Sequence, residues 1–280
     1  MWENEKIMTG YRICSLYSGS TGNAVLLETP RTKILIDAGK NARALTGALA
    51  AVGVDVGEID AVLITHDHRD HVSALPVLLK HHALPVHVVE ASAQVIAYGA
   101  GEEVLRCLCR HTPLFTVQVG EVTVRSFITP HDSAFSVGYR MTLPDAQGRE
   151  HAIGYATDIG YVSEEVRAGL LGCESVVLEC NHDREMLLTG PYPYRLKERI
   201  LSRYGHLSNE DCAALSSELA ARGARHLMLV HLSEQNNDPQ MAYDEVCGAI
   251  GDASVEVAVA APDVPVEMRI GIGEEARRVC

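Results

Sequence analysis

The stretch THDHRDH, residues 65–71, places four side chains capable of metal chemistry within six positions, directly after an apolar run. It supplies His66, His68, Asp70 and His71. Alternate side chains of an extended segment point to the same side, so His66 and His68 face one point, and a following turn carries Asp70 and His71 to a neighbouring point. Imidazole and carboxylate ligands suit zinc or manganese, with iron also possible. The spacing therefore predicts one loop that supplies ligands to two adjacent divalent ions.

Apolar residues on both sides of this stretch predict the elements that hold it. Residues 61–65 are typical of a buried parallel strand, and residues 72–80 carry apolar side chains at helical intervals. A histidine-rich surface turn that binds nothing is the alternative, but a dense group of donors directly after an apolar strand favours a ligand loop. Asp37 follows another predicted strand, 33–36, and we expect it to hydrogen-bond the loop rather than to bind metal.

Three further candidate ligands, His131, Asp158 and His231, each follow a predicted strand. Strand ends at one edge of a sheet are where α/β folds build their active sites. We therefore expect these residues to join the loop 65–71. The three strands are predicted at 122–128, 151–156 and 225–230.

Sorting the donors gives each ion three ligands, with Asp158 bridging both. Two ions about 3.5 to 4 Å apart can share a bridging hydroxide, because together they lower the pKa of water from about 15.7 towards about 7. His206, just before a predicted helix at 209–221, is then left to donate a proton to the leaving group or to hold a phosphate. The two proposed ligand sets are His66, His68 and His131, and Asp70, His71 and His231.

Composition is that of an ordinary globular protein. The 280 residues are 47% hydrophobic and 22% charged, which fits one α/β domain over 11–272, with an N-terminal extension at 1–10 and a C-terminal tail at 273–280. No apolar run suggests a membrane span, the N-terminus lacks the pattern of a signal peptide, and the eight cysteines form no CxxC pair, so we expect a cytoplasmic protein with reduced thiols. A formal charge of −13 argues against general nucleic-acid binding, but not against a nuclease with a local positive potential.

Two segments are candidates for substrate contacts. The loop SGSTGN, residues 18–23, joins two predicted strands, and its Ser20 and Thr21 could hold a phosphate, although a plain turn is the simpler interpretation. A basic run follows the chain break GPYPY; it is either a phosphate-binding face or a solvated helix face. The basic residues of this run are Arg195, Lys197, Arg199 and Arg203.

The order of these motifs resembles the metallo-β-lactamase superfamily over nearly the whole chain. The resemblance implies a four-layer αββα sandwich with a dinuclear site at one edge. GHLSN followed by VHLS is similar to the tRNA 3′-processing and ribonuclease J branch, in which His206 would assist catalysis and His231 would bind metal. SGSTGN, TDIGY, ECNHD, GPYPYRLKERI and HLSEQNN together resemble the YycJ/WalJ-type hydrolases, a group associated with 5′-exonuclease action on duplex DNA. The interval between Asp158 and His231 is too short for the extra clamp domain of ribonuclease J-like enzymes.

The sequence therefore favours a metal-dependent phosphodiesterase with DNA as substrate. A thioesterase or lactonase of the same fold is the alternative, which the acidic charge favours. Asp70 and His206 are the expected catalytic residues. The expected substrate contacts are Ser20, Thr21, His182, Arg195, Lys197 and His206.

Overall fold

The structure, a computed structural model, describes residues 10–145 and 148–271. The predicted terminal segments 1–10 and 273–280 lie outside these ranges, except for Gly10, which begins the first strand.

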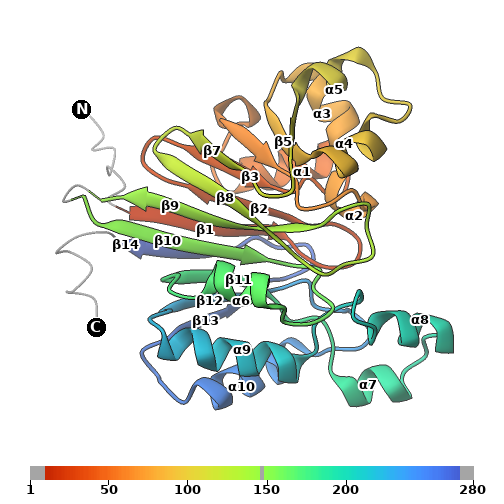
Figure 1. The fold of residues 1–280 in the computed structure, drawn as a ribbon, viewed down its shortest axis with the longest axis vertical. Coiled ribbons are helices and arrows are strands. Elements are labelled where there is room, and N and C mark those ends of the chain that lie inside the picture. Colours follow the sequence, from red (N-terminus) through yellow and green to blue (C-terminus); the bar gives the residue numbers. More distant parts are fainter. Residues whose placement is uncertain (1–9, 146–147, 272–280) are drawn as a thin grey trace.

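Two seven-stranded sheets form the centre of the molecule (Figure 1). In the first sheet the strands are ordered β14-β1-β2-β3-β4-β5-β6; pairing is antiparallel from β14 to β3 and parallel from β3 to β6. Its strands are β1 (Gly10–Tyr17), β2 (Ala24–Glu28), β3 (Lys33–Ile36), β4 (Ala61–Leu63), β5 (Val86–Val89), β6 (Leu108–His111) and β14 (Val266–Gly271).

The second sheet repeats this mixture of pairings. Its order is β13-β12-β11-β10-β9-β8-β7, parallel from β13 to β10 and antiparallel from β10 to β7. Its strands are β7 (Thr116–Val119), β8 (Val122–Ile128), β9 (Val137–Pro144), β10 (Glu150–Ala156), β11 (Ser175–Glu179), β12 (His226–Val230) and β13 (Glu256–Val259).

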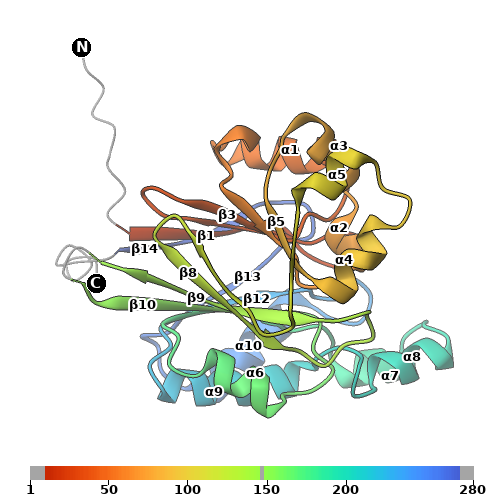
Figure 2. The same cartoon turned by 45° about the horizontal axis from the view of Figure 1, so that its top comes forward.

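Helices cover the outer face of each sheet, which confirms the predicted αββα sandwich (Figure 2). The helices that follow strands of the first sheet are α1 (Ala42–Ala51), the 3-10 helix η1 (Val56–Glu58), α2 (Arg69–Val72), α3 (Leu75–His81), α4 (Glu90–Ala97) and α5 (Glu102–Cys107). Those on the side of the second sheet are α6 (Glu164–Leu170), α7 (Arg184–Thr189), α8 (Tyr194–Ile200), α9 (Asn209–Ala221) and α10 (Pro239–Ile250). Helices α7 and α8 project beyond the edge of the sandwich (Figures 1 and 2). Among the described residues, no helix combines the length and the apolar character that crossing a bilayer requires.

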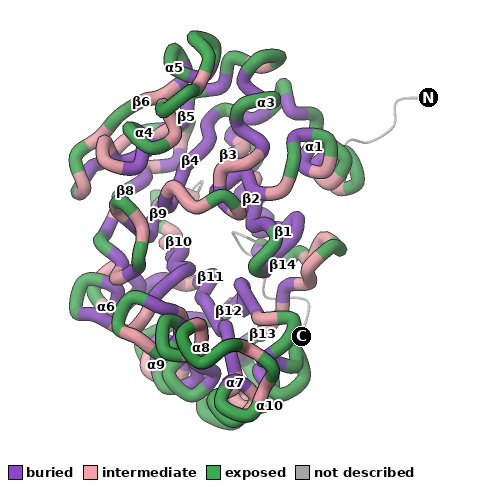
Figure 3. Tube along the Cα trace, turned by 90° about the vertical axis from the view of Figure 1, so that its right-hand side faces the viewer, coloured by how far each residue is buried: buried purple, intermediate pink, exposed green. Residues whose placement is uncertain are grey.

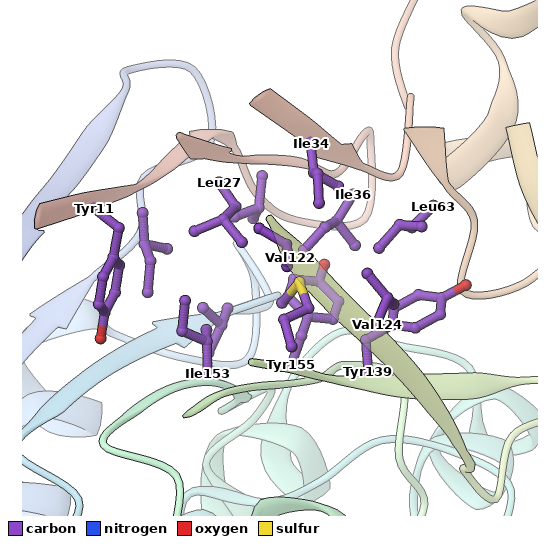
Figure 4. Close-up of a cluster of buried hydrophobic side chains, with 14 of the residues drawn as sticks. Tyr11, Leu27, Ile34, Ile36, Leu63, Val122, Val124, Tyr139, Ile153 and Tyr155 are labelled. Carbon is purple, nitrogen blue, oxygen red and sulfur yellow. The ribbon is translucent and has the colours of Figure 1, made fainter. Parts of the chain in front are cut away.

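The hydrophobic core has three parts, one between the sheets and one under each helical layer. The central part receives side chains from both sheets, among them Leu27, Ile34 and Tyr155 (Figure 4). Each such side chain contributes about 1.5 to 3 kcal/mol when it is fully buried. Tyr139 of β9 lies in the same layer and donates its hydroxyl hydrogen to the carbonyl of Ile64, 2.5 Å away, so the second sheet supports the start of the ligand loop. Figure 3 shows the strands buried and the outer helix surfaces exposed.

The structure corrects the elements predicted around the loop 65–71. Strand β4 ends at Leu63, not Thr65, because the Thr65 backbone N–H donates to the Asp37 carboxylate instead of to a neighbouring strand. The predicted helix 72–80 is two helices, α2 and α3, because the N–H of Ala74 donates to the carbonyl of Ala38. Asp70 and His71 thus lie on a short helix. The sequence patterns did not predict η1, α5, β6, β7, α7 or α10.

Candidate metal centre

The fold brings all the predicted metal ligands to one edge of the sandwich. The loop 65–71 follows β4, and the other ligands follow β8, β10 and β12. Their potential ligand atoms form overlapping groups in which all atoms lie within 4.8 Å of one another. Three of these groups are His66, His68 and His131; Asp70, His71 and His231; and His66, His71 and Asp158, and a fourth combines Asp158 and His231 with Glu179 and His206.

In most of these imidazoles, one ring nitrogen is held by a protein oxygen while the other is directed into the cluster. The Nδ1–H of His71 donates to Asp37 at 2.8 Å, that of His231 to Glu179 at 2.8 Å, and that of His131 to the Gly205 carbonyl at 3.1 Å. Metal-binding histidines are fixed in this way, because the outer hydrogen bond sets the tautomer and the ring orientation.

Two of the remaining nitrogens carry the strongest indication that a ligand belongs here. The Nε2 atoms of His66 and His231 are buried and have no hydrogen-bond partner among the described residues. Leaving a buried polar atom unpaired costs about 1 to 3 kcal/mol, so a site that creates two of them needs something to bind them. A divalent cation fits both atoms, and the carboxylates nearby offset its charge.

Asp158 lies between the two principal groups and is only 1% exposed. Its Oδ1 is 3.6 Å from His131 Nε2, while its Oδ2 is 3.3 Å from His71 Nε2. The two oxygens thus face different imidazoles, as a bridging ligand requires. Burial alone would raise the pKa of this carboxyl, but His231, His71 and His131 lower it, so the group is charged.

Asp37 supports the loop, as predicted. Its carboxylate accepts hydrogen bonds from the Thr65 backbone N–H at 2.9 Å, from the Thr65 hydroxyl, and from His71. The hydroxyl oxygen of Thr65 is in turn 3.0 Å from His66 Nδ1. One buried aspartate therefore orients two of the candidate ligands.

Glu179, which the sequence analysis missed, has the corresponding role on the second sheet. It ends β11 and is completely buried. Its Oε1 accepts from His231 Nδ1 and from His206 Nδ1 at 2.9 Å, and its Oε2 accepts the backbone N–H groups of Ile159 and Leu207. The sequence did contain a signal for this role. Glu179 is an acidic residue at the end of an apolar strand, and Asp37 directly follows another apolar strand.

The histidines fall into two electrostatic classes. Burial lowers the pKa of His66 and of His131, so these rings are neutral and present lone pairs. For His231 burial acts in the same direction, but the carboxylates of Asp158, Asp70 and Glu179 outweigh it and raise the pKa to about 10. The carboxylates around His231 favour a positive charge at this position. A bound metal ion would supply that charge in place of the proton.

Backbone strain is concentrated at this edge. The described non-glycine residues with positive φ are Asp37 (60°), Lys40 (53°), Asp158 (54°) and His231 (59°). Such conformations cost about 1 to 3 kcal/mol each and persist where the surrounding structure fixes them, often at functional sites. Three of these four residues belong to the cluster described above.

The loop 18–23 is connected directly to the candidate ligands. Asn23 accepts the Gly19 N–H at 3.0 Å through Oδ1 and donates through Nδ2 to Asp70 at 3.1 Å. Ser20 and Thr21 lie at the exposed tip of the loop and make no hydrogen bond with the described residues. The loop is therefore a structured turn whose tip has free donors.

The basic run has fewer free charges than the sequence indicates. Lys197 donates to the carbonyls of Leu188 and Gly190, Arg199 forms an ion pair with Asp132, and Arg203 lies over the ring of Tyr161 at 4.5 Å. Arg195 of α8 is exposed, and its side chain has no ion pair or hydrogen bond with the described residues. His182 is 1% exposed and its ring nitrogens have no partner among the described residues, so it offers no surface to a polymer.

Comparisons with known proteins agree with this geometry. Residues 32–232 match the family described as the beta-lactamase superfamily domain. The exodeoxyribonuclease WalJ of Streptococcus pneumoniae is 32% identical over 89% of this chain and 92% of its own length. The exodeoxyribonuclease YycJ of Bacillus anthracis is also 32% identical, over 83% of this chain and 86% of its own.

Solved structures share the fold at lower identity. The metallo-beta-lactamase fold protein YhfI of Bacillus subtilis is 19% identical with a TM-score of 0.69, over 92% of this chain and 100% of that one. Zinc-bound PqqB of Methylobacterium extorquens is 14% identical with a TM-score of 0.68, over 92% and 100%. The short form of human tRNase Z is 16% identical with a TM-score of 0.60, over 91% and 98%.

Proposed function

The chain belongs to the beta-lactamase superfamily, and from this membership and its likeness to the WalJ and YycJ exodeoxyribonucleases we propose that it is a metal-dependent phosphodiesterase that degrades DNA from the 5′ end. The observation that carries the proposal is the cluster of candidate ligands, in which the buried Nε2 atoms of His66 and His231 have no hydrogen-bond partner in the described part of the chain.

We assign two divalent ions, zinc or manganese with iron possible, to two sets of ligands joined by Asp158. When bound, such ions lower the pKa of the attacking water and neutralise charge on the phosphate. The chain's part is to hold the ligands in place before binding, through Asp37 on the first sheet and Glu179 on the second. The two proposed sets are His66, His68 and His131, and Asp70, His71 and His231.

His206 is the proposed proton donor to the leaving alkoxide. Its Nδ1–H donates to Glu179, and its Nε2 makes no hydrogen bond with the described residues. The ring lies 5.2 Å from that of His131 and 5.1 Å from that of His231, between centroids, so it is beside the cluster. The Glu179 carboxylate holds the ring through Nδ1, which leaves Nε2 to carry the proton that is transferred as the P–O bond breaks.

A direct assay tests the proposal. Purified protein with manganese or zinc is incubated with duplex and single-stranded DNA labelled at the 5′ or the 3′ end, with a thioester and a lactone as controls. We expect labelled mononucleotides from the 5′ end, and loss of turnover when His68 or Asp70 is replaced by alanine. Faster turnover of the thioester or lactone would instead support the small-molecule hydrolase that the net charge of −13 favours.

A further inference from the structure

A polar cavity adjoins the candidate metal centre on the side of Asp70. Its volume is about 520 Å³, and Asp70 forms part of its wall. The remaining wall comes from the tip of the loop 18–23, from Lys40 and Asn41 at the start of α1, and from Arg69 and Ser73 of the α2 region. A group bound in the cavity would therefore lie next to Asp70, a member of the ligand group with His71 and His231.

Among the described residues that line the cavity, Arg69 is the cation without a partner. Arg69 is exposed, and its guanidinium has no ion pair or hydrogen bond with the described residues. Lys40 lies on the same wall, but its ammonium contacts Asp263, donates to the carbonyl of Pro262 at 2.9 Å and lies over the ring of Tyr17. Lys40 is thus fixed in the structure, whereas the Arg69 guanidinium is available to a ligand.

Neutral donors form another part of the cavity wall. The hydroxyl and backbone N–H groups of Ser20 and Thr21 make no hydrogen bond with the described residues. The base of their loop is nevertheless ordered, because Gly22 N–H donates to the Gly19 carbonyl at 3.1 Å and Asn23 spans the turn. Preorganised N–H and O–H donors beside a guanidinium match the oxygens of a phosphate.

A second cavity, of about 340 Å³, adjoins His131 on the other side of the centre and has a different character. Its wall includes Tyr161, Tyr204 and Phe135, and its described lining residues include no lysine or arginine. Of the two cavities, the one beside Asp70 therefore offers a polyanion the guanidinium of Arg69.

We propose that the cavity at Ser20, Thr21 and Arg69 binds a phosphate of the DNA strand next to the one that is cleaved. The proposal rests on the proposed function and adds a phosphate subsite to it. The bound group is either a 5′-terminal phosphate or the neighbouring backbone diester, and both present the same oxygens to Arg69.

The test compares substrates with one phosphate and with several. For wild type and for Arg69→Ala and Arg69→Lys, kcat and KM are measured on a short oligonucleotide with a 5′-phosphate, on the same oligonucleotide with a 5′-hydroxyl, and on a chromogenic diester with a single phosphate. Arg222→Ala is the matched control, because Arg222 is an exposed arginine at the C-terminal end of α9 whose side chain has no partner among the described residues. Metal content and thermal stability are recorded for every variant.

We expect Arg69→Ala to raise KM for oligonucleotides about ten times more than it raises KM for the chromogenic diester. For this variant, the slope of log affinity against log salt concentration should become shallower by about 0.7 on single-stranded DNA, which is the value for one lost phosphate contact. Arg69→Lys should restore part of both effects, and Arg222→Ala should change neither. If the loss is confined to the 5′-phosphorylated oligonucleotide, the terminal phosphate is the ligand; an equal loss on both oligonucleotides identifies the backbone diester.

Two other outcomes separate this proposal from the proposed function. If Arg69→Ala cleaves oligonucleotides and the diester with unchanged KM and salt slope, the subsite is wrong while the nuclease stands. If the wild type cleaves no oligonucleotide but hydrolyses a thioester or lactone, the proposed function fails first.

Discussion

At the scale of single residues, the site depends on carboxylates that do not face the substrate. Asp37 and Glu179 are both 0% exposed, and each accepts hydrogen bonds from a histidine and from backbone N–H groups. A buried carboxylate is stable only when it is hydrogen-bonded throughout, and these two are. They hold the imidazoles in fixed tautomers, so the ligand atoms are in position before any ion binds.

Glu179→Gln tests this arrangement. Glutamine has one accepting oxygen, so it can accept either the two Nδ1–H bonds of His206 and His231 or the two backbone N–H bonds that Oε2 accepts now, but not both, and its NH2 group then faces other donors. We expect metal affinity to fall by about 10- to 100-fold and kcat to fall even at saturating metal, because His206 is no longer oriented. Metal titration by calorimetry and steady-state kinetics measure the two effects separately.

Glu174→Gln is the control for this prediction. Glu174 lies just before the opposite end of the same strand and pairs with His151, which is not among the candidate ligands. An unchanged metal affinity in Glu179→Gln, with the same thermal stability as the control, would contradict the supporting role of Glu179.

At the scale of elements, α8 is attached to the ligand edge through one ion pair. Arg199 of α8 contacts Asp132, whose backbone carbonyl is 3.2 Å from His68 Nε2. Arg195, one turn earlier on the helix, has no such partner among the described residues. The two arginines of this helix therefore differ in function, although the sequence analysis grouped them as one basic face.

Charge reversal separates the two arginines. Arg195→Glu should weaken DNA affinity and flatten its salt dependence by about 0.9 on duplex DNA if α8 contacts a phosphate. It should leave thermal stability unchanged, because no described contact is lost. Arg199→Glu should in addition lower the melting temperature, since it places two carboxylates together. Binding isotherms at several salt concentrations and thermal melts measure these effects; identical behaviour of both variants would show that the Asp132 pair has no structural effect.

At the scale of the whole molecule, the candidate metal centre joins the two halves of the sandwich. The loop 65–71 belongs to the first sheet, whereas His131, Asp158 and His231 belong to the second. Three buried carboxylates, Asp37, Asp158 and Glu179, lie at this junction. A bound cation would therefore link segments far apart in the sequence and reduce carboxylate repulsion at the same time.

Metal removal should therefore lower the stability of the entire protein. A ligand that binds only the folded state stabilises it by about 2.7 kcal/mol at a concentration 100 times its dissociation constant. We expect chelation to lower the melting temperature by several degrees, and zinc or manganese to restore it. Asp158→Asn should show a smaller metal-dependent shift than the wild type, because a bridging charge is lost. A melting temperature that is independent of metal in the wild type would contradict the assignment of metal to this edge.

The sequence by itself determined which residues follow strands and what chemistry they have. Local hydrophobic patterns locate strand ends, and β8 (Val122–Ile128) and α9 (Asn209–Ala221) have the predicted bounds. Because parallel strands end at a common edge, the donors after them can be grouped from the sequence alone. The resemblance to the YycJ/WalJ-type hydrolases, the αββα fold and the metal-dependent hydrolase class are confirmed for the same reason: the motifs extend over nearly the whole chain.

Only the tertiary structure decided how each charge is used. Glu179 appears in the sequence as one acidic residue among many, and its role depends on Ile159, His206 and His231, which come from other segments. Lys197 appears as a free cation, but the folded chain provides it with two carbonyl acceptors. Partners of polar side chains are set by contacts between segments distant in the chain, and these contacts leave no periodic pattern in the sequence.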